Sequence, residues 1–327
     1  MMFLKIDMKQ MREIQPHRNT EKSEQGPSVS FANLALKQVC TLGECLLWDA
    51  RGQRWCWTDI EEACVFTWTG GKDFPLRHAL PDRSGCFAIA KSGRWLIGLA
   101  KGLAWGDWEG QSLVVTPLCP VEAEQPETRI NDGRTDRSGR LVFGTLHEAA
   151  ERLPTGRFYQ YSLDHGLRRL DLPPVRIANS ICFSPDGRTM YFTDTPTGMI
   201  QQCSYDSDTG QVGEPRTFAH VTAPGYPDGS VVDAQGCLWN AQWGASRVQR
   251  FSPEGQLLFE VLCEAPQITC PAFGGADLDT LMITSAREHM GPQALEQSPL
   301  SGSLFCHQAL GGLGLQDAFF DDQPSTT

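Results

Sequence analysis

Residues 224–251 read PGYPDGSVVDAQGCLWNAQWGASRVQRF, and this stretch joins a strand pattern to a candidate catalytic carboxylate. Residues 236–241 and 247–251 alternate between apolar and polar side chains, which predicts two short strands connected at a glycine turn. Just upstream, Asp228 lies between a proline and a glycine and precedes an apolar pair. The stretch therefore predicts a hairpin and, before it, a strand with an acidic side chain at its start.

The same pattern recurs along the chain: a turn ending in glycine, then an apolar or aromatic strand. The copies are WDARGQRWCWTDI from Trp48, AKSGRWLIGLA from Ala90, TDRSGRLVFGTL from Thr135, SPDGRTMYFTDT from Ser184, VDAQGCLWNAQ from Val232 and a degenerate AFGGADLDTLMITSA from Ala272. The turn glycines of the first five copies are separated by 41, 46, 48 and 49 residues. A period of about 40–50 residues with several short strands is typical of a β-propeller blade. Six copies predict an all-β fold, a six-bladed β-propeller with a central channel.

The alternative is a β-sandwich with unrelated hairpins, since turns of this kind are common in all-β proteins. The steady spacing over most of the chain favours the propeller. We expect one domain over residues 31–327, preceded by a polar N-terminal extension over residues 1–30. A strand near residues 34–39 should pair with the last blade and close the ring, which removes an exposed edge. Residues 311–327 predict a last strand and a short tail.

Composition limits the partners. The net charge of −11 argues against a nucleic-acid partner, and no run of apolar residues is long enough to span a membrane. The 12 cysteines include no C-x-x-C pair, so most should be buried in a reducing, cytoplasmic environment. Most tryptophans fall in strands and predict blade core, with Trp243 as the best candidate for a stacking surface. The sequence leaves the oligomeric state open.

Four oxygen-bearing side chains share one position in the repeat, eight residues before the turn glycine: Glu44, Asn131, Asn179 and Asp228. Equal phase in a propeller means equal height around the channel, so these side chains should converge. Taken alone, Glu44 has the ordinary alternative of a solvated strand end. Two carboxylates with amide oxygens suit one divalent metal ion, Ca²⁺, Mg²⁺ or Mn²⁺, with Zn²⁺ less typical of such ligands. No histidine occupies this phase, so a histidine-based zinc site lacks support.

Five segments carry a family resemblance: LGECLLWD, RINDGRTDRSGRLVFGTL, ANSICFSPDGRTMYFTDT, PDGSVVDAQGCLWNAQWGASRVQRFSPEG and TCPAFGGADLDTLMITSARE. In this order they resemble the SMP-30/gluconolactonase/LRE family, which includes regucalcin and bacterial sugar lactonases. The resemblance covers residues 42–288. It implies a metal held by Glu44, Asn179 and Asp228, with Asp228 also acting as general base, and a substrate that faces Arg129 and Asn131.

One position departs from the family pattern. After the strand that ends in Gly144-Thr145-Leu146, regucalcin-like members carry adjacent acidic residues, one of which contacts the sugar, whereas this chain has His147-Glu148-Ala149. Glu148 is the candidate for this substrate contact in a shifted register, and the alternative is that the contact is absent.

Together with these residues, the resemblance implies metal-dependent hydrolysis of a sugar (aldono) lactone. A cyclic ester needs a polarised carbonyl and an activated water, for which a metal and the Asp228 base suffice. Arg129 is placed to stabilise developing negative charge. Three alternatives stay open: a non-enzymatic calcium-binding propeller, a phosphotriesterase-like hydrolase and a protein-interaction propeller.

Overall fold

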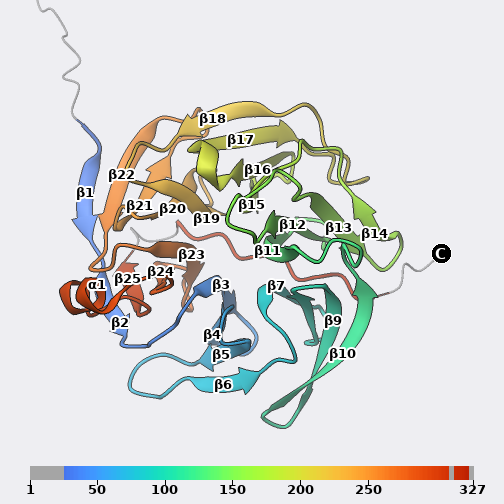
Figure 1. The fold of residues 1–327 in the computed structure, drawn as a ribbon, viewed down its shortest axis with the longest axis horizontal. Helices are drawn as coiled ribbons and strands as arrows, with labels where there is room; N and C mark the ends of the chain where they lie inside the picture. The colour runs from blue at the N-terminus through green and yellow to red at the C-terminus, as the bar shows by residue number, and fades with distance from the viewer. Residues whose placement is uncertain (1–25, 309–312, 324–327) are drawn as a thin grey trace, which may run out of the picture.

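The structure is a computed structural model that describes residues 26–308 and 313–323. Its strands form six sheets of four or five strands, arranged as blades around a central axis (Figure 1). The first strands of neighbouring blades contact one another all around the ring. The predicted six-bladed β-propeller is confirmed.

Four blades are antiparallel sheets of consecutive strands. Blade 1 contains β3 (Gly43–Asp49), β4 (Arg54–Asp59), β5 (Cys64–Trp68) and β6 (Leu76–Ala79). Blade 2 contains β7 (Ser84–Ile89), β8 (Trp95–Leu99), β9 (Gly102–Glu109) and β10 (Ser112–Pro120). Blade 3 contains β11 (Thr128–Thr135), β12 (Leu141–His147), β13 (Phe158–Ser162) and β14 (Gly166–Arg169). Blade 4 contains β15 (Ala178–Phe183), β16 (Thr189–Asp194), β17 (Met199–Ser204) and β18 (Arg216–His220), with the 3-10 helix η1 (Thr195–Thr197) between β16 and β17.

The last two blades each take in an N-terminal strand. Blade 5 contains β19 (Tyr226–Val232), β20 (Leu238–Trp243), β21 (Arg247–Phe251) and β22 (Leu257–Leu262), to which β1 (Ser28–Phe31) adds in parallel. Blade 6 contains β23 (Ile268–Gly274), β24 (Thr280–Ser285) and β25 (Leu304–Gln308), with α1 (Pro292–Gln297) in the long connection before β25. Its outermost strand is β2 (Asn33–Leu36), which pairs antiparallel with β25. The predicted closing strand is confirmed, at residues 33–36.

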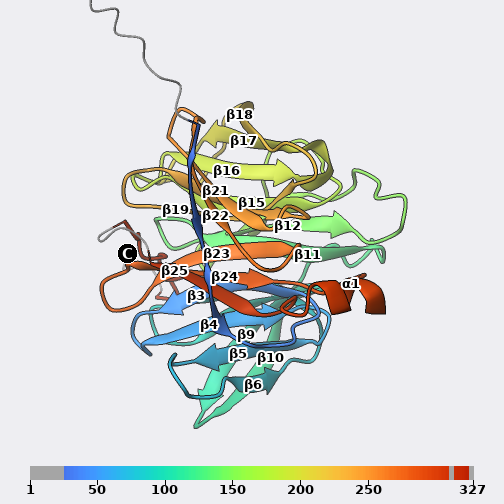
Figure 2. The same cartoon turned by 90° about the vertical axis from the view of Figure 1, so that its left-hand side faces the viewer.

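Figure 2 shows β1 and β2 running along the outside of the ring. Residues 28–30 of the predicted polar extension belong to β1, whereas residues 1–25 of that extension lie outside the described residues.

The repeated turns have a common chemistry. In blade 5, the Asp233 carboxylate accepts hydrogen bonds from the backbone N–H groups of Gln235 and Cys237, both at 2.9 Å. Asp136 does the same in blade 3 with Ser138 and Arg140, at 3.0 and 2.8 Å. Such side-chain caps satisfy backbone donors that the tight turn leaves unpaired. Four of the five turn glycines also have positive φ, between 70° and 95°, which other residues adopt only with strain.

The core lies between the faces of neighbouring blades. Trp57, Trp95 and Trp239 are fully buried there, and Trp48 and Trp55 are buried as well, so the prediction of tryptophans in the blade core is confirmed. All 12 cysteines have free thiols and ten of them are buried. The cytoplasmic location that the cysteines predict stays a prediction. Within the described ranges, no helix is long and apolar enough to cross a membrane.

Residues 313–323, here called the C-terminal strap, form no strand, so the prediction of a last strand after residue 311 is wrong for this part of the chain. The strap instead crosses the end of the channel that carries the repeated turns (Figure 1). It exchanges backbone hydrogen bonds with blades 5, 6, 3 and 2, at Ala234, Leu278, Gly139, Ile89 and Lys91. Inside the channel, Asp317 of the strap forms an ion pair of 2.6 Å with the buried Arg134. In Figure 2, α1 projects from the opposite face of the ring.

Candidate active site

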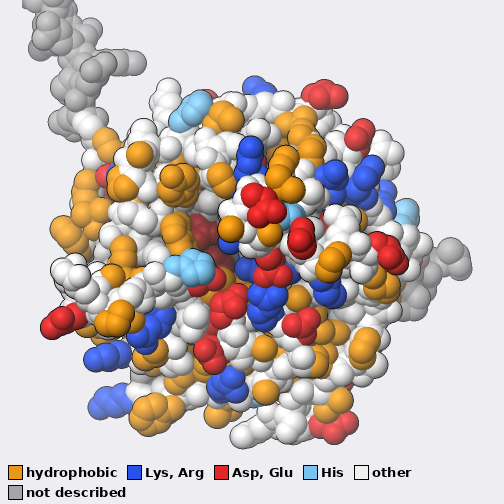
Figure 3. All heavy atoms as spheres, viewed as in Figure 1, with side chains coloured by type: hydrophobic (Ala, Val, Ile, Leu, Met, Phe, Trp, Pro, Cys, Tyr) orange, Lys and Arg blue, Asp and Glu red, His pale blue; other side chains and the backbone are white. Residues whose placement is uncertain are grey.

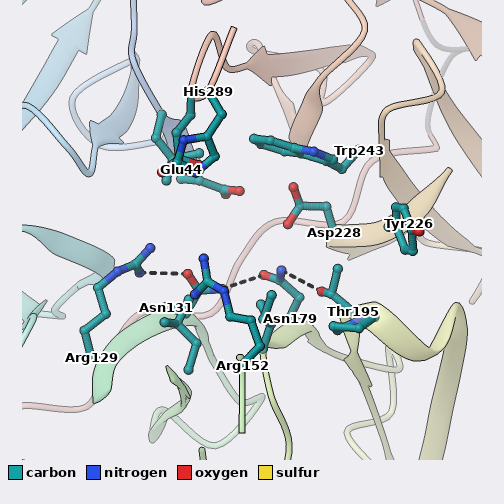
Figure 4. Close-up of a pocket in the computed structure, with 15 residues that line it drawn as sticks. Glu44, Arg129, Asn131, Arg152, Asn179, Thr195, Tyr226, Asp228, Trp243 and His289 are labelled. Carbon is teal, nitrogen blue, oxygen red and sulfur yellow. Dashed lines mark hydrogen bonds and ion pairs between the residues drawn. The ribbon is translucent and has the colours of Figure 1, made fainter. Parts of the chain in front are cut away.

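A cavity of about 390 Å³ opens at the end of the channel opposite the strap. Glu44, Asn131, Asn179 and Asp228 all line it, so the structure brings together the four side chains that share one phase in the sequence (Figure 4). Figure 3 shows this face of the ring, with acidic and basic side chains gathered around its centre. Charged side chains are thus concentrated where the first strands of the blades begin.

Each of the four residues lies at a break in strand pairing. The register between the first and second strands shifts between Glu44 and Leu47, Ile130 and Asp132, Asn179 and Cys182, and Pro227 and Ser230. Such a bulge bends the strand and redirects a side chain that regular alternation would place on a blade face. Cys45 and Ser180, next to two of the site residues, have positive φ of 46° and 61°. The bulges thus lie where the carboxylate and amide groups enter the cavity lining.

The carboxylates of the site are buried and close to other negative charges. Burial, followed by the charge of Asp132, raises the pKa of Glu44 from 4.5 to about 8. Burial and the charges of Glu44 and Asp132 raise the pKa of Asp228 well above its ordinary value. Only 7% of Glu44 and 5% of Asp228 are exposed, so water screens this repulsion poorly. A bound cation would offset the repulsion between these carboxylates.

A chain of hydrogen bonds fixes the amides (Figure 4). Arg129 Nη1 donates to Asn131 Oδ1 at 2.8 Å, and Asn131 Nδ2 donates to Asn179 Oδ1 at 3.2 Å. Asn179 Nδ2 donates in turn to Thr195 Oγ1 at 3.0 Å, and Thr195 donates to the carbonyl of Pro227. These bonds fix the orientation of the Asn179 amide, whose oxygen can still use its second lone pair as a metal ligand.

Glu148, the candidate acidic substrate contact, is not among the residues that line the cavity. It lies next to Arg129 but outside the cavity lining, and the Arg83 guanidinium donates two hydrogen bonds to its carboxylate at 2.6 and 2.9 Å. Its Oε1 is 3.4 Å from Arg129 Nε. Arg129 itself lines the cavity and is buried.

Sequence reasoning missed several residues that line the cavity. They include Arg152 in the loop after β12, Thr195 and Pro196 in η1, Tyr226 at the start of β19, and Glu288 and His289 before α1. None of these residues shares the eight-residue offset: Tyr226 lies two residues before Asp228 in β19, and the others lie in connections of different length. Trp243, the one tryptophan that the sequence set apart, does line the cavity, beside Asp228 in Figure 4.

The donor set fits a hard divalent cation. Among the described residues, no group of three or more His, Cys, Asp or Glu is arranged to hold a metal ion. The predicted set differs from such a group, because it combines two carboxylates with the amide oxygen of Asn179. Oxygen donors of this kind suit Ca²⁺, Mg²⁺ and Mn²⁺.

The fold and the site define the chain as a six-bladed propeller with an oxygen-lined cavity at the start of its inner strands. Comparison with known proteins gives the family. The chain belongs to the SMP-30/Gluconolactonase/LRE-like family, whose model matches residues 42–287.

Among individual relatives, the chain is 42% identical over 271 residues to an L-arabinolactonase of Azospirillum brasilense, covering 82% of this chain and 88% of that protein. It is 35% identical over 273 residues to a 6-deoxy-6-sulfogluconolactonase of Pseudomonas putida, covering 83% and 92%. The fold is similar to the crystal structure of a calcium-binding protein, regucalcin, from Agrobacterium tumefaciens, with a TM-score of 0.83 at 30% identity, covering 90% of this chain and 99% of that one.

Proposed function

We propose that this protein hydrolyses an aldonolactone to the sugar acid, with one divalent metal ion held by Glu44, Asn179 and Asp228. The observation that carries the proposal is the convergence of two buried carboxylates and an oriented amide in one cavity, beside Arg129. Family membership supports it, because the relatives matched at 42% and 35% identity are both named as lactonases.

Asp228 is the proposed general base. Its carboxylate lies at the cavity wall, where it can take a proton from a water molecule as the water oxygen attacks the lactone carbonyl carbon. The carbonyl π bond opens, and when it re-forms the ring C–O bond breaks. Asp228 then returns the proton to the departing ring oxygen, which leaves the open-chain sugar acid. When bound, the metal supplies Lewis-acid polarisation of the carbonyl and lowers the pKa of water.

Arg129 and Asn131 are the proposed substrate-binding residues. The Arg129 guanidinium and the Asn131 amide are joined by a 2.8 Å hydrogen bond, so they present a fixed pair of polar groups to the cavity. Such a pair can orient hydroxyl groups and stabilise the negative charge that develops on the carbonyl oxygen. On the other side, Trp243 and Tyr226 offer aromatic surface to the C–H face of a sugar ring. This division favours a polyhydroxylated substrate over an apolar ester.

A second candidate function is calcium binding without catalysis. It is favoured by the likeness to a regucalcin whose structure is described as that of a calcium-binding protein. The site chemistry is the same in both cases, so turnover distinguishes the two.

The test is a pH-indicator assay of metal-stripped protein against five- and six-carbon aldonolactones, including arabinono-, glucono- and galactonolactone and a sulfonated gluconolactone. Mg²⁺, Ca²⁺, Mn²⁺ and Zn²⁺ are added back separately. Acid release that one metal restores on one lactone supports the enzyme and selects substrate and cofactor. Tight metal binding without turnover of any lactone would favour the calcium-binding alternative.

A further inference from the structure

Resting on the proposed function, we infer that Arg83 is a positioning residue: through Glu148 it holds the Arg129 guanidinium in the orientation that the substrate requires. The evidence is a chain of charged contacts that starts outside the cavity and ends at its wall.

The first link is a two-pronged pair. Arg83 Nη1 and Nη2 donate to the two carboxylate oxygens of Glu148 at 2.6 and 2.9 Å. A planar fork with two parallel bonds fixes the carboxylate in direction as well as in position. Glu61 adds a longer contact to Arg83 at 3.5 Å. About 30% of each side chain in the Arg83–Glu148 pair is exposed, so the pair should add little to the free energy of unfolding. Its two bonds nevertheless fix the orientation of the Glu148 carboxylate.

The second link reaches the cavity. Glu148 Oε1 is 3.4 Å from Arg129 Nε, which has no hydrogen-bond partner and is buried. Arg129 Nη1 is used by the carbonyl of Ile130 and by Asn131 Oδ1. Glu148 thus supplies the negative charge beside the inner edge of the guanidinium, while the other edge faces Asn131 and the cavity.

The surroundings of Glu148 agree with a fixed, ionised carboxylate. Partial burial opposes its ionisation, but the hydrogen bonds from Arg83 and the charges of Arg129, Arg83 and Lys101 outweigh burial and lower the pKa of Glu148. The three cations come from different segments: Arg83 precedes β7, Arg129 lies in β11 and Lys101 lies between β8 and β9. Glu148 itself follows β12. The network therefore ties two blades together at the cavity mouth.

Losing the Arg83 fork should free Glu148 to turn toward water and leave Arg129 buried without its counter-charge. Other carboxylates that act on Arg129 are Glu61 and Glu288, and Glu288 lines the cavity. The guanidinium is then drawn toward these acids and away from Asn131. Misplacement of a substrate-orienting group by about 1 Å costs on the order of 100-fold in rate.

The experiment compares Arg83→Met and Glu148→Gln with Arg94→Met and Asp107→Asn. The control pair Arg94–Asp107 is also two-pronged, through Nε and Nη2 at 2.6 and 2.9 Å, and neither residue lines the cavity. Both site variants should lower kcat/KM roughly 10- to 100-fold, with unchanged metal affinity and thermal unfolding similar to the controls. The control variants should keep wild-type kcat/KM.

Two further variants separate positioning from a general structural role. Arg83→Lys keeps the charge but not the fork, so it should recover only part of the loss. The double variant Arg83→Met with Glu148→Gln should lose no more than Glu148→Gln alone, because both changes act through Arg129. Wild-type kcat/KM in both single variants, or additive losses in the double variant, would overturn the inference.

A crystal structure of Arg83→Met gives a readout that does not depend on activity. We expect the bond between Arg129 Nη1 and Asn131 Oδ1 to be broken, and an intact bond would overturn the positioning role. If the wild-type protein hydrolyses no lactone with any metal, the proposed function fails on its own, and this structural comparison still decides whether Arg83 positions Arg129.

Discussion

Glu44 and Asp228 line the same cavity from the first strands of blades 1 and 5, and burial, followed by the charge of Glu44, raises the pKa of Asp228 (Figure 4). Both side chains are buried, so the repulsion between them is poorly screened. A propeller ring brings together residues that are far apart in the chain, and here it places two buried carboxyl groups in one cavity.

Changing Glu44 to Gln should weaken metal binding by at least about 10-fold, since a buried ligand charge is lost while its shape is kept. Calorimetric titration of the stripped protein with each metal measures this effect. The site can still bind at higher metal concentration, so activity of Glu44→Gln should return as metal is raised. An unchanged metal affinity would contradict the assignment of Glu44 as a ligand.

Asp228→Asn should behave differently, because it removes the proposed base as well as a ligand charge. We expect kcat to fall by about 10²–10⁴-fold and to stay low when metal is raised to saturation. The measurement is kcat at saturating metal, with Glu44→Gln under the same conditions as the matched control. Full recovery of Asp228→Asn by metal alone would leave Asp228 a ligand and remove it as base.

The metal-stripped protein should lose stability as pH rises from about 5 to about 8. Burial and Asp132 raise the pKa of Glu44 from 4.5 to about 8, so in this range the folded chain binds more protons than the unfolded chain. The stabilising effect is complete below the unfolded-state pKa and is lost as pH rises through the folded-state pKa. Urea unfolding across this range measures the slope, which saturating metal should remove and Glu44→Gln should reduce. Equal slopes for the stripped wild-type protein and Glu44→Gln would refute the prediction.

Trp243→Ala should raise KM by roughly 10-fold with little change in kcat, since apolar contact with a sugar ring is made equally in the ground and transition states. Trp243→Phe keeps an aromatic face and should stay close to wild type. Steady-state kinetics on the preferred lactone measures both. A fall in kcat without a change in KM would assign Trp243 to the chemistry instead of to binding.

Asp317→Asn should lower the free energy of unfolding by about 3 kcal/mol, because it leaves the buried Arg134 charge without its partner. The control is Asp107→Asn, whose pair with Arg94 is exposed and should contribute less than about 1 kcal/mol. Urea denaturation of both variants gives the comparison. Equal stability of the two would mean that the strap does not depend on its ion pair.

The repeat of glycine turns was sufficient to predict six blades, because each turn is a local event: a carboxylate caps nearby backbone donors and a glycine accepts positive φ. The equal offset of Glu44, Asn131, Asn179 and Asp228 from those turns also predicted that they meet. In a closed ring of similar blades, residues at the same position in the repeat lie at the same height along the channel. A local sequence pattern therefore predicted contacts between distant parts of the chain. The ring closure by β2 followed from the same logic of pairing an otherwise exposed edge.

Other features depended on how separate segments pack. The bulges at the site residues arise from pairing between strands, and Arg152, Glu288 and His289 reach the cavity from connections of unequal length. Glu148 shows what the sequence could not predict. Its position in the chain identified an acidic residue near the site, but its partner Arg83 comes from another blade and holds it next to Arg129, outside the cavity lining. The strap likewise had the composition of a strand, yet it finds its partners on the turns of four blades. Sequence by itself determined the repeating unit and the phase of its polar residues, since both are local; tertiary structure decided which charges face each other, because that depends on the closing of the ring.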